Sequence, residues 1–219
     1  MSTTPPGDPS VISYWRLRQS LGVLAFVMPL WVRLGAKFWE HIPSTDSISA
    51  YYYTSMRDVF VGSLCAVGVF LFCYRGYDRV ENWVTNIAGL AATGIGLLPM
   101  EPEYHAVLRA KYSGLGGPTC YVPHGLLGFH FTVVCIFFGL ISYLVVFRFT
   151  KTDQPIPTPR KRMRNRVYVA CGIAMIGSFV VIGVLKWQAP TASIFVPETI
   201  AVLAFSLAWL TKGEALLPD

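Results

Sequence analysis

The sequence predicts an all-α fold, a polytopic bundle of six membrane-spanning helices. Of the 219 residues, 53% are hydrophobic and only 14% are charged, with a mean hydropathy of +0.49; soluble domains usually carry about 25% charged residues. The charged residues leave six apolar windows between them, and a helix needs roughly 20 apolar residues to cross a ~30 Å hydrocarbon core. Residues 59–72 and 133–146 are apolar without the alternation of barrel strands, which favours helices.

A polar N-terminal segment (1–16) precedes a predicted transmembrane domain over residues 17–214. The first span follows Arg16 and Arg18, as in a signal peptide, but it ends in Trp31 and Arg33 and not in a small-residue cleavage site. We therefore expect it to be retained as a helix. The expected spans are approximately 17–36, 56–74, 83–100, 124–147, 167–185 and 193–211.

Small residues indicate how the spans pack. The third span carries Ala88, Ala92 and Gly96 at four-residue spacing, and small residues allow close backbone approach where lipid gives little hydrophobic drive between helices. We expect this span to be central in the bundle. A homo-oligomer formed through such small-residue faces is the alternative.

The distribution of basic residues predicts the orientation. Lysine and arginine accumulate on the cytoplasmic side of short loops, and most of the 18 fall there if both termini are cytoplasmic. The loop over residues 150–166 contains Pro155, Pro157 and Pro159, which we expect to keep it extended, followed by a basic cluster. That cluster is Arg160, Lys161, Arg162, Arg164 and Arg166. We interpret it as a topology anchor, with binding of anionic lipid headgroups as the alternative.

Polar residues gather at the outer ends of the spans, where ionisable groups are costly and are default candidates for function. Asp58 opens the second span, where the helix dipole favours a carboxylate, and Glu198 follows Pro197 at the start of the sixth. The catalytic candidates are Ser49, Tyr53, Asp58, His130 and Glu198, and the ligand-binding candidates are Tyr52, Arg57 and His124.

No cofactor is predicted, and zinc is kept as a lesser alternative. Its candidate ligands are His105, His124 and His130. His124 and His130 are separated by about 9 Å along a helix, so they do not form the i, i+4 pair of a helical zinc site. A zinc ion would therefore need further ligands from the loops.

An ordered set of motifs resembles a family of uncharacterised bacterial multi-pass inner-membrane proteins. The motifs are SISAYYYT (47–54), MRDVFVG (56–62), YRGYD (74–78), NRVYVACG (165–172) and SLAWLTKGE (206–214). The resemblance implies a multi-pass protein of the bacterial inner membrane, with no established reaction.

Residues 49–54 also resemble a short motif of the superfamily of alkaline ceramidases and progestin and adiponectin receptors, whose hydrolases are zinc-dependent. Tyr53 stands where that motif has histidine, and no histidine follows His130.

Three classes of function remain open. The leading hypothesis is binding or modification of a membrane lipid near the outer leaflet, because polar helix ends converge there beside aromatic residues. The alternatives are a transporter or channel for a small solute or ion, and a structural or accessory membrane protein. Whether the chain is an enzyme is left open, since no Gly-rich phosphate loop or GxSxG elbow is present. Membrane lipids are the expected partners, a homo-oligomer through the small-residue faces stays open, and nothing suggests nucleic-acid binding.

Overall fold

The structure, a computed structural model, describes residues 9–42, 44–98, 100, 129–152, 158–189 and 192–217, with side chains of the first helix from Tyr14 onward. All regular elements in these residues are helical, which confirms the predicted all-α class. The long helices are α1 (Pro9–Trp39), α2 (Arg57–Cys73), α3 (Arg79–Leu97), α5 (Phe129–Tyr143), α6 (Pro159–Gln188) and α7 (Phe195–Lys212). Two short elements accompany them, a 3₁₀ turn η1 (Ser49–Tyr53) and a π-helical turn η3 (Leu144–Arg148) that continues α5.

Four segments are long and apolar enough to cross a membrane, namely Tyr14–Trp39, Phe129–Arg148, Pro159–Gln188 and Phe195–Lys212. Large apolar side chains also cover the outside of the bundle; Ile173 is 66% exposed and Phe26 is 48% exposed. Contiguous exposed apolar surface of this kind marks contact with a membrane or a partner. The described part of the chain thus has the character of a membrane-embedded bundle.

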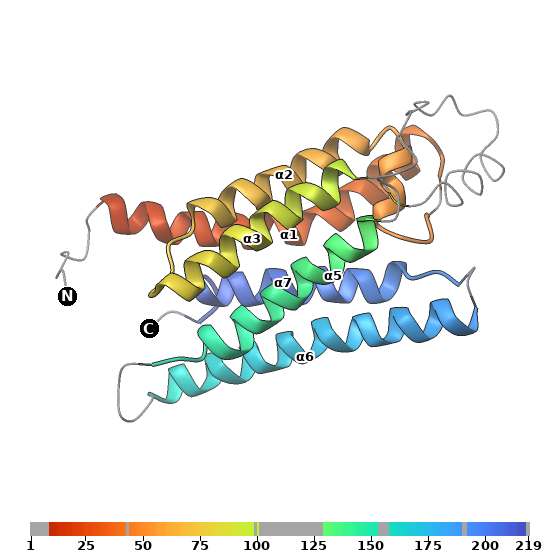
Figure 1. The fold of residues 1–219 in the computed structure, drawn as a ribbon. Helices are drawn as coiled ribbons and strands as arrows, with labels where there is room; N and C mark the ends of the chain where they lie inside the picture. Colours follow the sequence, from red (N-terminus) through yellow and green to blue (C-terminus); the bar gives the residue numbers. More distant parts are fainter. Residues whose placement is uncertain are drawn as a thin grey trace.

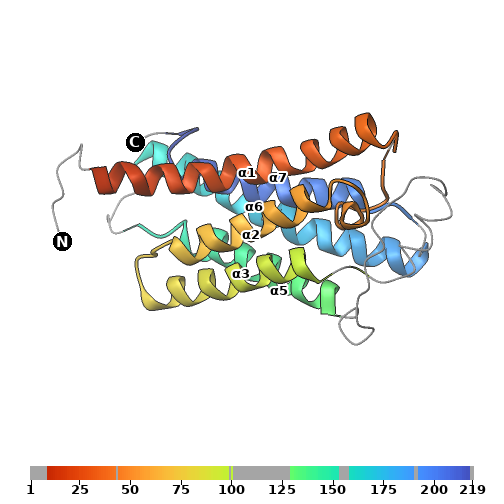
Figure 2. The ribbon, with the colours of Figure 1, turned by 90° about the horizontal axis from the view of Figure 1, so that it is seen from above.

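The long helices run side by side along one direction, with consecutive helices alternating in direction (Figures 1 and 2). Helix α2 packs on α1 and α3, α5 packs on α3 and α6, and α7 packs on α6 and α1. The start of α1 and the end of α7 lie together, where Gln19 Nε2 donates to Gly213 O at 2.8 Å. We call this end of the bundle the termini end. The other end, which carries η1, is called the opposite end.

Helix α6 begins earlier than the sequence analysis predicted. Its first residue is Pro159, and Thr158 caps it by accepting a hydrogen bond from Lys161 N at 3.1 Å. A capping threonine followed by proline at the first helical position favours a helix start. The basic cluster expected in a loop therefore lies in the first turns of α6, because Pro159 starts a helix here and does not hold the chain extended.

Glycines allow a close contact between α2 and α3. A Cβ atom at Gly68 would lie 2.8 Å from Gly89 O, and a Cβ at Gly89 would lie 2.8 Å from Gly68 O. Further along α3, Ala88 and Ala92 are fully buried. The small residues of this helix therefore face its neighbours, whereas Gly62 on α2 has no atom within 4 Å of its Cβ position.

A polar network lies at the termini end. The carboxylate of Glu81, which is 1% exposed, accepts hydrogen bonds from Tyr74 Oη at 2.7 Å and from Tyr77 N at 2.9 Å. The guanidinium of Arg18 lies 5.3 Å from the centre of the Tyr74 ring. Nearby, Arg148 forms an ion pair with the α3 cap residue, Asp78.

Candidate functional site

A short segment before and within η1 folds over the opposite end of the bundle and is attached to α7. Asp46 O accepts a hydrogen bond from Ile194 N at 2.7 Å. In the first turn of α7, the carboxylate of Glu198 lies 2.8 and 2.9 Å from Ser47 Oγ and accepts from Ile48 N at 2.5 Å. These contacts fix the position at which Ser49 begins η1.

Ser49 is joined to the first turn of α5 through His130. His130 Nε2 lies 3.0 Å from Ser49 Oγ, and His130 Nδ1 lies 2.6 Å from Leu98 O. A carbonyl oxygen can only accept a hydrogen bond, so Nδ1 carries a proton and donates it to Leu98 O. In the neutral imidazole ring, Nε2 carries no proton and therefore accepts a hydrogen bond from the Ser49 hydroxyl. His130 is 7% exposed and held from both sides.

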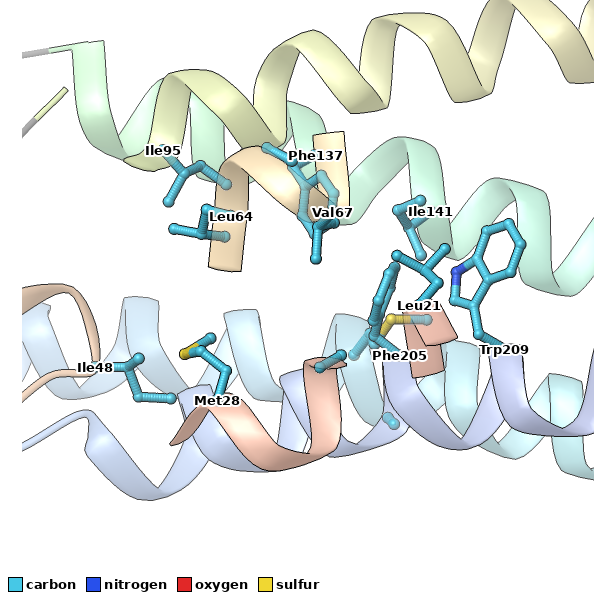
Figure 3. Close-up of a cluster of buried hydrophobic side chains, with 14 of the residues drawn as sticks. Leu21, Met28, Ile48, Leu64, Val67, Ile95, Phe137, Ile141, Phe205 and Trp209 are labelled. Carbon is cyan, nitrogen blue, oxygen red and sulfur yellow. The ribbon is translucent and has the colours of Figure 1, made fainter. Parts of the chain in front are cut away.

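Ser49, His130 and Glu198 line one cavity of about 350 Å³. The walls come from all six long helices and are mostly aliphatic or aromatic. They include Leu24, Met28, Ile48, Phe60, Leu64, Val67, Ile95, Val134, Phe137, Phe138, Phe179, Ile182, Val202 and Phe205. In Figure 3, Leu64, Val67 and Phe137 lie on one side of this space and Ile48 and Met28 on the other.

The cavity is polar at one end and closed by aromatic rings at the other. Lys186 joins Ser49, His130 and Glu198 at the polar end. Towards the termini end, Phe205 packs on Phe137 with 5.7 Å between ring centres. The wall from residue 198 to residue 205 of α7 corresponds to about 10 Å of helix. The cavity is therefore a short apolar slot with a polar mouth, confined to the opposite half of the bundle.

Part of the cavity wall is exposed between α5 and α6. Near the termini end, Gly172 of α6 packs against Val146 of η3, and α5 and α6 diverge towards the opposite end (Figure 1). There, the cavity is lined by Phe131, which is 58% exposed, and by Gly183, which is exposed and has no atom within 4 Å of its Cβ position. The slot can therefore be reached from the side of the bundle, where hydrocarbon chains would surround it.

The structure brings together only some of the predicted site residues. Tyr53 lies beside the cavity and donates to Met100 O at 2.6 Å, while Arg57 donates to Tyr52 Oη at 2.9 Å. Asp58 faces away from this site, exposed in a separate groove between α1 and α2. His105 and His124 lie outside the described residues.

Two polar residues of the cavity wall were not among the sequence-derived candidates, Lys186 and Ser63. Lys186 stands next to Trp187 at the end of α6, a pattern typical of an interfacial anchor, and its Nζ donates to Ala192 O at 3.2 Å. Ser63 lies within an apolar run and gives no sequence signal.

The basic cluster at the start of α6 divides into two groups. Arg164 is buried and lies 3.5 Å from the Glu214 carboxylate, and Lys161 donates to Phe149 O at 2.8 Å. Arg160, Arg162 and Arg166 are exposed. The exposed group retains the surface position that headgroup binding would need.

The described residues contain no group of three or more His, Cys, Asp or Glu side chains that could hold a metal ion. No family model, curated protein or solved structure matches this chain. The site must therefore be interpreted from its own geometry.

Proposed function

We propose that all six long helices span the inner membrane of a bacterium, with both termini in the cytoplasm. The four apolar segments support this arrangement, and α2 and α3 run beside them along the bundle (Figure 1). The 17 residues of α2 correspond to about 25 Å of helix, close to the thickness of the hydrocarbon core. Both helices also expose apolar side chains, Val69 on α2 and Leu90 on α3.

This topology predicts that tags at the two termini are found in the same compartment. Alkaline phosphatase fused to either terminus should be inactive, because it must be exported to fold, whereas green fluorescent protein should fluoresce at both. A fusion inserted at Pro43, between α1 and η1, serves as the external control. Opposite results at the two termini would contradict an even number of spans.

In this topology, the protein binds a single-chain lipid near the outer leaflet. The chain occupies the apolar slot, and the polar head lies at the mouth beside Ser49, His130, Lys186 and Glu198. The observation that carries this proposal is the cavity of about 350 Å³, which has polar residues at one end and exposed residues of α5 and α6 in its side wall. Its volume is at the lower end of the ~300–1,000 Å³ range of ligand pockets, which suits one hydrocarbon chain better than two.

The exposed part of the side wall provides the test. A fatty acid carrying a photoreactive diazirine on its chain should cross-link to cavity-lining peptides of the protein in vesicles. Replacing Gly183 with tryptophan places a large ring in this part of the wall, so we expect the cross-link yield to fall at least fivefold. Peptide mass spectrometry after irradiation measures this yield.

Gly177→Trp is the matched control. Gly177 is also exposed on α6, has no atom within 4 Å of its Cβ position, and is not part of the cavity wall. We expect its yield to match that of the wild type. Equal yields for the two variants, or cross-links spread over the outer surface of the bundle, would overturn the proposal.

A further inference from the structure

A serine, a histidine and a carbonyl form a hydrogen-bonded chain at the mouth of the cavity. The order is Ser49 Oγ–H to His130 Nε2, at 3.0 Å, and His130 Nδ1–H to Leu98 O, at 2.6 Å. In enzymes of many folds, a serine hydroxyl becomes an effective nucleophile when a base accepts its proton and a third group orients that base. Leu98 O fixes the tautomer that leaves Nε2 free of a proton and facing the serine.

From this geometry we infer that Ser49 is a nucleophile, activated by His130, that cleaves the ester bond of a single-chain acyl lipid held in the cavity. The inference rests on the proposed lipid binding and adds a reaction to it. Both side chains line the same cavity, so an acyl chain in the slot would bring its ester group to the mouth, where the hydroxyl lies.

The surroundings of Ser49 hold it in place before any substrate arrives. Ser49 N donates to Ser47 Oγ at 3.2 Å, and Ser47 Oγ in turn contacts the Glu198 carboxylate. Catalytic groups act best when their supporting contacts hold them in the productive geometry. Glu198 is therefore a positioning residue in this scheme, because it acts on Ser49 through Ser47.

The reaction needs only water as a second reactant. Ser49 Oγ attacks the ester carbonyl carbon and its proton passes to His130 Nε2; the bond between that carbon and the alcohol oxygen then breaks, and His130 returns the proton to the leaving alcohol. A water molecule, deprotonated by His130, attacks the acyl-serine and releases the fatty acid, restoring the Ser49 hydroxyl. The ammonium of Lys186 at the same mouth supplies positive charge for the developing oxyanion.

The hydrogen bonds of His130 also join η1 to α5, so the test must separate catalysis from a structural role. His130→Gln retains a side-chain amide that can donate to Leu98 O, but glutamine does not accept a proton as imidazole does. A structural role would be preserved in this variant and general-base catalysis would be lost. Removal of a general base typically lowers a rate about 100-fold to 10,000-fold.

The probe is an alkyl fluorophosphonate with one long chain, which forms a stable phosphonyl-serine with loss of fluoride. With the full-length protein in vesicles, we expect a single adduct at Ser49, located by peptide mass spectrometry. Ser49→Ala should abolish it, and His130→Gln should slow labelling at least 100-fold. Ser55→Ala is the control, since Ser55 is an exposed serine between η1 and α2 that does not line the cavity. Release of fatty acid from a monoacylglycerol should likewise be lost in Ser49→Ala and slowed in His130→Gln.

The outcomes separate this inference from lipid binding. If Ser49→Ala and His130→Gln still cross-link the diazirine fatty acid as the wild type does, the variants are folded and their loss of labelling reports the reaction. Wild-type protein that cross-links the fatty acid but gives no adduct at Ser49 would overturn the reaction and leave lipid binding standing. Protein that does neither would overturn both.

Discussion

Glu81→Leu is expected to lower the free energy of unfolding by about 2 to 6 kcal/mol, because two hydrogen-bond donors would each lose their acceptor at a cost of about 1 to 3 kcal/mol. Glu81 is 1% exposed and holds Tyr74 Oη and Tyr77 N through separate carboxylate oxygens. Arg18 is 8% exposed and lies over the Tyr14 and Tyr74 rings of the same network. Without the carboxylate, Tyr74 Oη and Tyr77 N would lose the acceptor that joins them. Titration of the protein in micelles with dodecyl sulfate, followed by circular dichroism, measures the change.

Two further variants separate charge from hydrogen bonding. Glu81→Gln keeps an acceptor for one of the two donors but removes the negative charge, so we expect a loss between those of the leucine variant and the wild type. Asp58→Asn removes a carboxylate that is exposed on α2, and surface changes of this kind usually stay within about 0.5 kcal/mol. A Glu81→Leu protein as stable as Asp58→Asn would show that the network does not hold the termini end together.

The sequence carried enough information for the class of fold and for part of the site. Runs of apolar residues determine where helices can lie in hydrocarbon, and polar residues at their ends must lie at one membrane face or the other. Ser49, His130 and Glu198 were therefore grouped by their expected depth, and the structure places all three on one cavity. Depth alone does not give the direction in which a residue faces around a helix axis. Asp58 lies in the first turn of α2, at the same end of the bundle as the other candidates, yet it faces the groove between α1 and α2.

Other features depend on contacts that no sequence pattern displays. The orientation of His130 is set by Leu98 O, a backbone carbonyl contributed by the end of α3. Lys186 resembles any lysine at a membrane interface until α6 places it at the cavity mouth. The early start of α6 was missed because the prolines before the basic cluster were interpreted as extended chain, whereas Thr158 and Pro159 form a helix start.

Gly68→Leu is expected to lower the free energy of unfolding by at least about 1 to 3 kcal/mol, the usual cost of overpacking. Its Cβ atom would lie 2.8 Å from Gly89 O, which belongs to the backbone of α3 and cannot turn aside as a side chain can. The two helices would have to separate. Ser63, Leu64 and Val67 on α2 and Ile95 on α3 line the cavity, so the slot would also be distorted and cross-linking of the diazirine fatty acid should fall.

Gly62→Leu is the matched control for this prediction. It lies on the same helix and gains the same helix propensity, about 1 kcal/mol relative to glycine, but it faces the open groove beside α1 with no atom within 4 Å of its Cβ position. We expect its stability to equal or exceed that of the wild type. Because propensity cancels between the two variants, the difference in their unfolding free energies measures the α2–α3 contact itself. Equal stabilities would mean that these backbones do not meet at Gly68 and Gly89, and the wall that α2 and α3 give the cavity would have to be placed differently.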